Sequence, residues 1–529
     1  VVPSPRGMTP APGADGPGAE VVTPLYRVAF DATGGVSAWE LSYRGSKRLV
    51  VGGPVPPLAV GIGRPGQPPE LIPMRPQTER LALGPDQPAG ELVFTGRAAD
   101  GLQVEKRLRM RADSYRIETA LRVQGPAPAG LTVFLYWTGP VAVPGATPEE
   151  PWHTFGEGAD RRQLLGRILV AGNGNPVVFE PPAPALRDPR EAGGPGLKDP
   201  HLVPVSVVGD RRWVALENDY FIAALVPSGD TQVLRGRVPE LAQVGLVFTD
   251  VGAERGRAWE GRSLLYVGPK EWNRLTALGV GLEQAQARNY GCFPLPCDYG
   301  GPLPMQWVCA PLLWLMNFFA ARLPGQNYGV AIILLTVLVK IAFYPLTHKS
   351  MSSMKQMQAL QPQLNALRSK YKSDPQRFQR EQLDLFRKHK VNPMGGCLPM
   401  VVQIPIFYAL YLTLQYSVEL QGAYFIPYWI EDLSKKDPYY VLPILMGFSM
   451  LVQQKMTPIV GDPRQARIML IMPVIFTFMF LEFPTGLVLY WLVNNLLSIG
   501  QQHLIDRSAR RRPPLDPALS KPAKEARKA

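Results

Sequence analysis

The residues from Gly329 to Leu346, GVAIILLTVLVKIAFYPL, form an almost entirely apolar run that contains one charged residue, Lys340. At 1.5 Å per residue, a helix of this length crosses most of a bilayer. Further apolar runs follow at about 398–417, 439–456, 467–483 and 486–504. Because such runs are typical of membrane-spanning helices, the sequence predicts an α-helical membrane domain of five transmembrane helices over residues 327–505.

The sequence before residue 291 follows a different pattern. Apolar residues alternate with polar ones on both sides of the turn Ala112-Asp113-Ser114, which predicts a β-hairpin with one buried face made by Leu102, Val104, Leu108, Met110, Tyr115, Ile117, Thr119, Leu121 and Val123. Short apolar runs from Leu131, Phe221 and Gln243 lie between Gly and Pro clusters. We therefore expect a flexible lead-in at 1–20 and an all-β, large antiparallel sandwich at 21–290.

Residues 291–326 link the two predicted domains. Met305 to Leu323 is apolar almost all round, and we expect it to form an interfacial amphipathic helix, with a spanning helix as the alternative. Cys292 and Cys297 either form a local disulfide or are two free thiols. The N-terminus has neither an initiator Met nor an apolar signal segment, so we expect a targeting or anchoring segment to precede it.

The formal net charge of the chain is +13, and its basic residues cluster in segments beside the predicted spans, where they determine the orientation of the membrane domain. Lys and Arg greatly outnumber Asp and Glu in the loop between the first two predicted spans, and they recur after the third span and in the basic tail at 506–529. Positive loops remain in the cytoplasm, so these segments are predicted to be cytoplasmic and the β domain to lie outside. Basic residues placed in this way also argue against nucleic-acid recognition.

The loop at 347–395 is predicted to be a cytoplasmic helical hairpin. Met351, Met354 and Met357 lie at intervals of three on one helical face, which Leu360, Leu364, Leu367 and Tyr371 continue. Ser373-Asp374-Pro375 ends this helix and caps a second one. The Met-rich face either packs within the hairpin or makes adaptable contacts with apolar client segments.

Two explanations of Lys340 remain open. Its long side chain could reach the cytoplasmic interface. Alternatively, Thr336, Lys340, Tyr344 and Thr347 form one polar stripe that faces a bundle interior or a wet cavity. Polar residues of the other spans could face this stripe: Gln403, Gln415, Gln453, Gln454, Asn494, Asn495, Ser498, Gln501 and Gln502. They include no carboxylate near mid-span, which disfavours a proton or cation pathway.

Several motifs resemble the YidC family of membrane protein insertases. They are VNPMGGCLPMVVQIPIFYALY from Val391, DPYYVLPILMG from Asp437, QQKMTP from Gln453 and FPTGLVLYWLVNNLLSIGQQ from Phe483. The resemblance covers the membrane region and its hairpin, and the β domain more loosely resembles the periplasmic domain of Gram-negative members. Lys340 stands where many members have Arg, so bidentate recognition of a carboxylate is lost. Trp491 stands where Tyr is common.

The resemblance implies an insertase and chaperone of the bacterial inner membrane, with its β domain in the periplasm and its C-terminus in the cytoplasm. The expected partners are nascent membrane proteins, the ribosome, the Sec translocon, a targeting factor (signal recognition particle or its receptor) and the lipid bilayer. We expect no enzyme activity, no catalytic residues, no cofactor and no metal. A hydrophilic groove open to cytoplasm and lipid would be lined by Thr336, Lys340, Gln403, Gln453, Tyr490, Trp491, Asn494, Asn495 and Ser498.

Two other classes of protein fit the sequence less well. A secondary transporter would show inverted repeats and charged sites at the middle of the membrane, and the sequence shows no repeat. A membrane-anchored carbohydrate-processing enzyme would require the β sandwich to act alone. Its scattered Trp and acidic residues, with His153 and His201, form no recognisable catalytic set.

Overall fold

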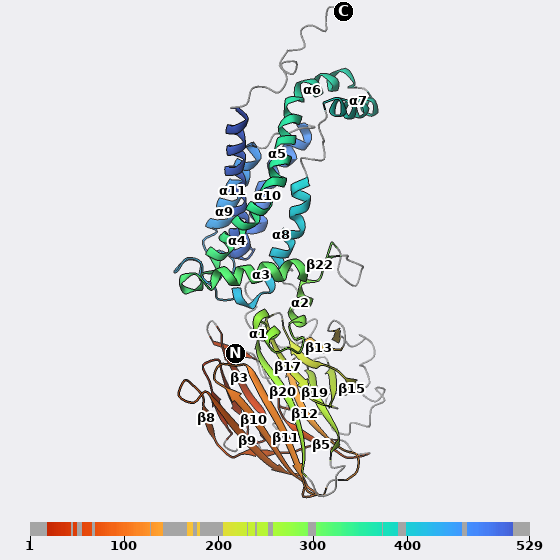
Figure 1. Cartoon of the computed structure of the whole chain (residues 1–529), viewed down its shortest axis with the longest axis vertical. Helices are drawn as coiled ribbons and strands as arrows, with labels where there is room; N and C mark the ends of the chain where they lie inside the picture. The colour runs from red at the N-terminus through yellow and green to blue at the C-terminus, as the bar shows by residue number, and fades with distance from the viewer. Residues whose placement is uncertain are drawn as a thin grey trace, which may run out of the picture. The chain divides into compact units, whose positions relative to one another are not determined.

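The computed structural model describes residues 18–43, 46–49, 55–65, 69–126, 128–140, 167–172, 177–179, 205–218, 220–229, 231–238, 241–251, 258–294, 303–372, 374–389, 398–456 and 463–510. The chain divides into two compact units, and the main boundary falls between Asn289 and Tyr290 (Figure 1). The first unit is built from strands and the second from helices. This is the order of a β-rich region followed by a helical region that the sequence predicts.

Three sheets make up the first unit. The 5-stranded sheet has the order β4(Ser46–Leu49), β3(Val36–Ser42), β2(Tyr26–Phe30), β1(Glu20–Val22), β8(Arg80–Ala82). The 9-stranded sheet has the order β14(Val177–Phe179), β13(Arg167–Ala171), β16(Trp213–Glu217), β17(Phe221–Pro227), β20(Trp259–Pro269), β11(Arg116–Gln124), β10(Gln103–Arg111), β9(Ala89–Arg97), β7(Met74–Pro76). The 6-stranded sheet has the order β15(Val205–Asp210), β18(Thr231–Val238), β19(Leu241–Val251), β12(Leu131–Pro140), β5(Val60–Gly63), β6(Glu70–Leu71).

Neighbouring strands in these sheets run antiparallel, apart from β1 and β8, which pair in parallel. One hydrophobic core is shared by strands of all three sheets, and Trp39, Trp137 and Trp213 are fully buried in it. Two short helices, α1(Trp272–Ala277) and α2(Gln284–Tyr290), follow the last long strand. The predicted antiparallel sandwich therefore describes the main part of this unit.

The β10–β11 hairpin has the predicted buried face. The strands pair from Gln103 with Gln124 to Arg109 with Glu118, and every apolar residue of the predicted set is buried. Lys106, which that set omits, lies on the same face and is also fully buried. Its Nζ donates to the carbonyl oxygens of Gly34 at 2.6 Å and Leu58 at 2.8 Å. A buried ammonium is costly, and burial lowers the pKa of Lys106 to about 7.

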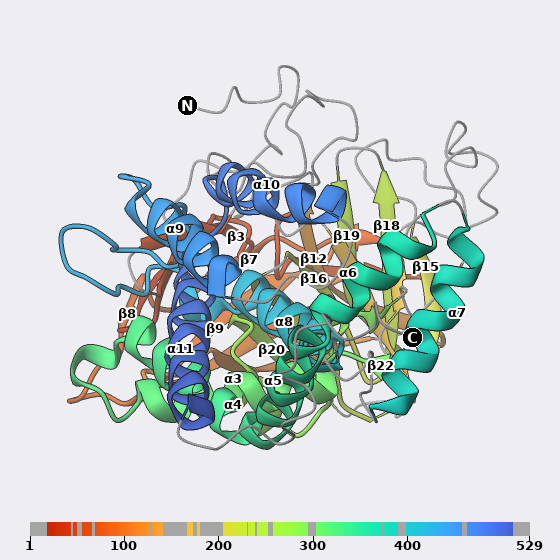
Figure 2. The same ribbon diagram turned by 90° about the horizontal axis from the view of Figure 1, so that it is seen from above.

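The second unit begins with a short ladder of β21(Cys292–Phe293) and β22(Leu303–Pro304). Its helices are α3(Gln306–Ala320), α4(Tyr328–Ala342), α5(Tyr344–Ala359), α6(Gln361–Lys370), α7(Pro375–Lys388), α8(Leu398–Tyr416), α9(Val441–Met456), α10(Pro463–Phe480) and α11(Thr485–Arg510), with short 3-10 turns at Pro324–Gln326 and Val418–Leu420. Helix α11 packs against α4 and α9, and it lies beside both in each view (Figure 1, Figure 2). Cys292 is disulfide-bonded, and its partner lies outside the described residues, whereas Cys309 is a free, buried thiol.

Two predicted continuous helices are broken, and those predictions were wrong. The first predicted span ends at Ala342, and α5 begins at Tyr344 after a bend of 60°. Pro345 explains the break, since it has no N–H to continue the helix. The first helix of the hairpin is likewise divided at Leu360, where Pro362 begins a new helix. Thr336 and Lys340 therefore lie on a different helix from Tyr344 and Thr347.

The second helix of the hairpin begins as predicted. Asp374 caps α7 by accepting a hydrogen bond from the Arg377 N–H, and Pro375 occupies the first turn. Met357 packs with Leu360, Leu364 and Phe386 inside the hairpin. Met351 is half-buried, and the side chain of Met354 lies outside the described residues. At Met357, packing within the hairpin is therefore the observed role of the Met-rich face.

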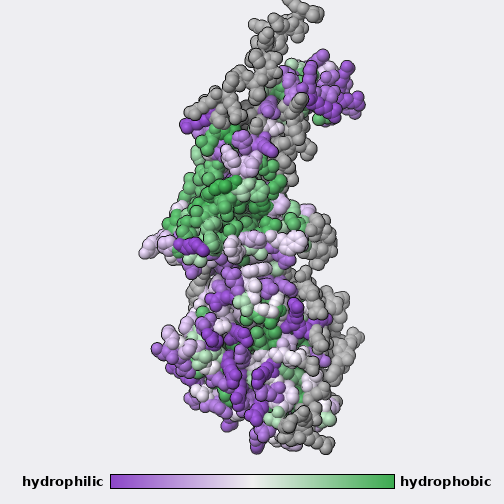
Figure 3. Space-filling model, viewed as in Figure 1, coloured by the Kyte–Doolittle hydropathy of each residue, from purple (hydrophilic) through white to green (hydrophobic). Residues whose placement is uncertain are grey.

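Within the described ranges, no single helix has both the length and the hydropathy of a membrane span, and the α4–α5 pair passes that test only as a bent pair. The helical unit nevertheless carries an extensive hydrophobic surface, green in Figure 3. It includes large exposed side chains of α9 and α10, namely Ile444, Leu445, Phe448, Ile471, Val474, Ile475 and Phe478. A surface of this size on a soluble monomer is unusual and marks contact with another apolar phase or partner.

Candidate functional site

Lys340 lies in the last turn of α4 and its charged group points at α11. Its Nζ donates a hydrogen bond to the Ser498 hydroxyl at 2.8 Å. The Lys340 side chain is partly buried, and within the part of the chain that the structure describes it has no carboxylate partner. A lysine in this position is therefore held by a neutral hydroxyl, which leaves its positive charge without a counter-charge from the described residues.

The Ser498 hydroxyl is one link in a longer set of polar contacts. It donates to the Asn494 carbonyl oxygen at 2.7 Å, and the Asn494 side-chain oxygen accepts from Gln403 of α8 at 3.0 Å. The Gln403 amide also approaches the Tyr490 hydroxyl at 3.5 Å, at the limit of a hydrogen bond. We call these five residues, Lys340, Ser498, Asn494, Gln403 and Tyr490, the polar chain. It connects α4, α11 and α8.

The helical repeat explains why α11 supplies three members of the polar chain. Tyr490, Asn494 and Ser498 are spaced by four residues, so they lie on one face of the helix. Ser498 is also satisfied by its own helix, since its bond to the carbonyl four residues back is the usual one for a helical serine. The polar chain is thus a stripe on α11 that receives one polar group each from α4 and α8.

A second polar contact joins α11 to α9. The Asn495 amide donates to the Ser449 hydroxyl at 3.1 Å, and both side chains are buried. Gln502 donates further along to the carbonyl oxygen of Met456. Polar pairs of this kind fix the position of one helix against another where no water is present. Asn495 is therefore a helix-packing residue in this structure, separate from the polar chain.

Trp491 lies in an aromatic cluster. Its ring is 4.6 Å from Phe407 of α8, and 5.1 Å and 6.0 Å from Phe480 and Phe476 of α10, measured between centroids. The edge-to-face arrangement with Phe407 and Phe480 is the favourable one for aromatic pairs. Trp491 is only partly buried, so part of its ring remains accessible at the rim of this cluster.

Two further predicted site residues, Thr336 and Gln453, are not members of the polar chain. Thr336 is buried and donates to the Ile332 carbonyl oxygen of its own helix at 2.7 Å. Gln453 is half-buried on α9. Sequence reasoning missed Ser449 and the three phenylalanines around Trp491. A four-residue spacing within α11 could have indicated the polar stripe, whereas the partners on other helices required the tertiary structure.

The arrangement offers binding chemistry. A cation, amides and hydroxyls in a row can exchange their mutual hydrogen bonds for bonds to a polar peptide, and the aromatic rim offers an apolar contact beside them. Among the described residues, no group of three or more His, Cys, Asp or Glu side chains could hold a metal ion. These properties suit the binding of a chain segment that carries both polar and apolar groups.

Comparison with known proteins identifies the family of the chain. Residues 319–512 match the family described as 60Kd inner membrane protein, and residues 203–315 match the YidC periplasmic domain. A membrane protein insertase YidC of Nitratidesulfovibrio vulgaris is 37% identical over 96% of this chain and 89% of its own length. One of Syntrophus aciditrophicus is 48% identical, but the match spans 58% of this chain and only 54% of that relative.

Among solved structures, that of an active YidC insertase with its first transmembrane domain resolved matches 92% of each chain at 19% identity, with a TM-score of 0.37. The family assignment rests on the sequence matches. They define an inner membrane protein with a periplasmic domain. More specifically, the chain belongs to the YidC family of membrane protein insertases. Members of this family are insertases and chaperones and not enzymes, in agreement with the sequence-based prediction.

Proposed function

We propose that this chain inserts nascent membrane proteins into the inner membrane, and that the polar chain lines the hydrophilic groove through which the polar flank of a client passes. The observation that carries the proposal is the bond between Lys340 and Ser498. It places a cation among apolar helices against a neutral partner, where a client carboxylate can replace the hydroxyl. A charge deep in a membrane is costly unless it faces a polar interior.

The apolar surface supports the second half of the proposal. Exposed side chains on α9 and α10, with Phe478 70% exposed, suit direct contact with lipid hydrocarbon. A client's apolar segment would move past the rim at Trp491 into lipid while its polar flank exchanges hydrogen bonds with the polar chain. The apolar segment gains stability because its surface is buried in hydrocarbon. The polar flank avoids the full cost of losing its hydrogen bonds to water.

We further propose five membrane crossings, made by α4 with the start of α5, α8, α9, α10 and α11. The distribution of Lys and Arg supports a cytoplasmic hairpin and tail. Helix α3 would lie at the membrane surface, since Trp307 and Trp314 are exposed on it. The hairpin would then face clients delivered by the ribosome or by a signal recognition particle or its receptor. Cooperation with the Sec translocon is part of the same proposal.

The test uses the full chain in proteoliposomes with a single-span client whose translocated flank carries either Asp or Asn. Protease protection of the flank reports insertion. Lys340→Met is expected to slow the Asp client by about fivefold relative to the Asn client, which corresponds to about 1 kcal/mol of lost attraction. Lys340→Arg should restore the preference. Lys349→Met, which removes an exposed lysine from α5, is the matched control and should leave it unchanged.

Equal slowing of both clients would show that Lys340 acts through packing and would contradict the electrostatic part. No slowing of either client would remove Lys340 and the polar chain from the insertion pathway.

A further inference from the structure

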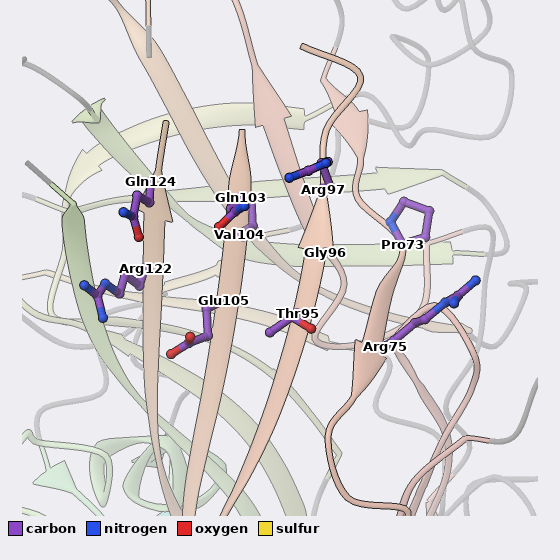
Figure 4. Close-up of a pocket in the computed structure, with 10 residues that line it drawn as sticks. All are labelled: Pro73, Arg75, Thr95, Gly96, Arg97, Gln103, Val104, Glu105, Arg122 and Gln124. Atoms are coloured by element: carbon purple, nitrogen blue, oxygen red, sulfur yellow. The ribbon is translucent and has the colours of Figure 1, made fainter. Parts of the chain in front are cut away.

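A pocket lies on the outward face of the 9-stranded sheet in the β unit, where β7, β9, β10 and β11 run side by side. Its volume is about 460 Å³, and seven of its ten lining residues are polar or charged (Figure 4). Strand pairing arranges the lining in two rows across the sheet. One row runs through Arg75, Thr95, Glu105 and Arg122, and the other through Arg97, Gln103 and Gln124.

The three arginines of the pocket differ from the other arginines of the same sheet face. Arg107, Arg109, Arg111, Arg116 and Arg262 each pair with a carboxylate. Within the residues that the structure describes, Arg75, Arg97 and Arg122 have no such partner. The one acidic residue of the lining, Glu105, is bonded to Arg107. The lining therefore carries three arginines against one carboxylate, and Glu260 of β20 lies opposite Arg122 in the strand register.

The spacing of these arginines selects among anions. Arg75 and Arg122 are three strands apart, roughly 14 Å at about 4.8 Å per strand. Figure 4 shows their guanidinium ends at opposite sides of the pocket, with Arg97 between them along the second row. A single phosphate or sulfate cannot contact all of them. An elongated ligand with several negative groups can.

The other lining residues favour a polypeptide over a glycan. The lining contains no aromatic side chain, so a sugar ring would have no flat apolar surface to pack on. Instead, Thr95, Gln103 and Gln124 offer side-chain donors and acceptors of the kind that bind peptide groups. About four residues of extended chain, at roughly 3.3 Å each, span the distance between the outer arginines, and alternate residues point to the same side. The guanidinium group of arginine forms strong, often bidentate hydrogen bonds with carboxylates, so the arginines of the pocket favour acidic side chains.

We infer that this pocket binds an extended acidic segment of polypeptide, with carboxylates at alternate positions held by Arg75, Arg97 and Arg122. The inference is independent of the polar chain and of the proposed insertion function, because it concerns only the β unit. It assigns this sheet face a role in holding chains that carry Asp or Glu.

The test is fluorescence anisotropy with the full chain in detergent and a labelled peptide of five Glu-Ser repeats. A Gln-Ser peptide of equal length is the neutral probe. The pocket variant carries Arg75→Gln, Arg97→Gln and Arg122→Gln. The control variant carries Arg109→Gln, Arg116→Gln and Arg262→Gln, which removes the same charge from exposed, carboxylate-paired positions of the same sheet.

The expected result is that the acidic peptide binds and the neutral one does not, that the pocket variant weakens binding at least tenfold, and that the control variant changes it less than twofold. Circular dichroism should be unchanged in both variants, since all six side chains are exposed. Equal weakening in both variants would show a general electrostatic field and overturn the inference. The inference would also be overturned if inorganic phosphate or anionic lipid vesicles competed as effectively as the unlabelled acidic peptide at equal charge.

Discussion

Lys106 allows a quantitative test of how the β unit tolerates a buried amine. Its pKa falls from the ordinary 10.5 to about 7 because burial disfavours the charged form, while Asp31 opposes the fall. Between these two values the unfolded chain binds more protons than the folded one, so stability rises with pH across this window. A difference of about 3.5 in pKa corresponds to a destabilisation of the folded state by about 5 kcal/mol. This destabilisation is present in full below pH 7 and disappears as the pH approaches 10.5.

The perturbation is Lys106→Met, which removes the charge but leaves the carbonyl oxygens of Gly34 and Leu58 without their donor. That second effect costs about 1–3 kcal/mol per carbonyl and does not depend on pH. The free energy of unfolding of wild type relative to the variant should therefore rise by about 3.5 kcal/mol from pH 7 to pH 10. Leu108→Met, on the same buried face, is the control and should show a constant difference from wild type.

The assay is urea unfolding of a fragment of residues 18–290, followed by the fluorescence of its buried tryptophans at each pH. A difference between wild type and Lys106→Met that stays constant within about 0.5 kcal/mol from pH 7 to pH 10 would refute the reasoning. In that case Lys106 would be charged at both pH values in the folded state. Its hydrogen bonds to the two carbonyl oxygens would then offset the cost of burying the ammonium group and keep its pKa near the ordinary value.

Two further predictions concern packing. Lys270 donates to Glu217 at 2.7 Å with both side chains fully buried, so Lys270→Met should destabilise the β unit by about 3–5 kcal/mol, measured by urea unfolding, and simultaneous Glu217→Leu should recover most of that loss. In the helical unit, a Cβ at Gly447 of α9 would lie 1.9 Å from the Thr477 hydroxyl of α10, so Gly447→Ala should lower stability in detergent by about 1–3 kcal/mol. Gly500→Ala meets nothing within 4 Å and should leave the melting temperature unchanged or raise it.

Sequence periodicity predicted the parts of the fold that local pattern determines. The alternation around residue 113 identifies the β10–β11 hairpin because a half-buried strand must alternate. The same alternation places position 106 on the buried face, but a lysine there contradicts the expectation that charges stay outside. Its acceptors, the carbonyls of Gly34 and Leu58, come from loops 72 and 48 residues away. No local pattern can reveal such partners.

The candidate site divides in the same way. The four-residue spacing of Tyr490, Asn494 and Ser498 is visible in the sequence, so a polar stripe on α11 was predictable. That Ser498 would contact Lys340 and Asn494 would contact Gln403 depends on how three helices pack. The prediction of one continuous span took no account of Pro345, which cannot donate the N–H that a continuous helix needs at this position.

The bend between α4 and α5 has a mechanical consequence. A continuous helix transmits rotation and thrust along its axis like a rod, whereas here the direction changes by 60° across Phe343, whose backbone has left the helical region. The torsion angles at this joint, together with those at the second break at Leu360, set the direction in which helices α6 and α7 of the hairpin extend. A change of the torsion angles at Phe343 would therefore redirect the hairpin without moving α4, the helix that carries Lys340.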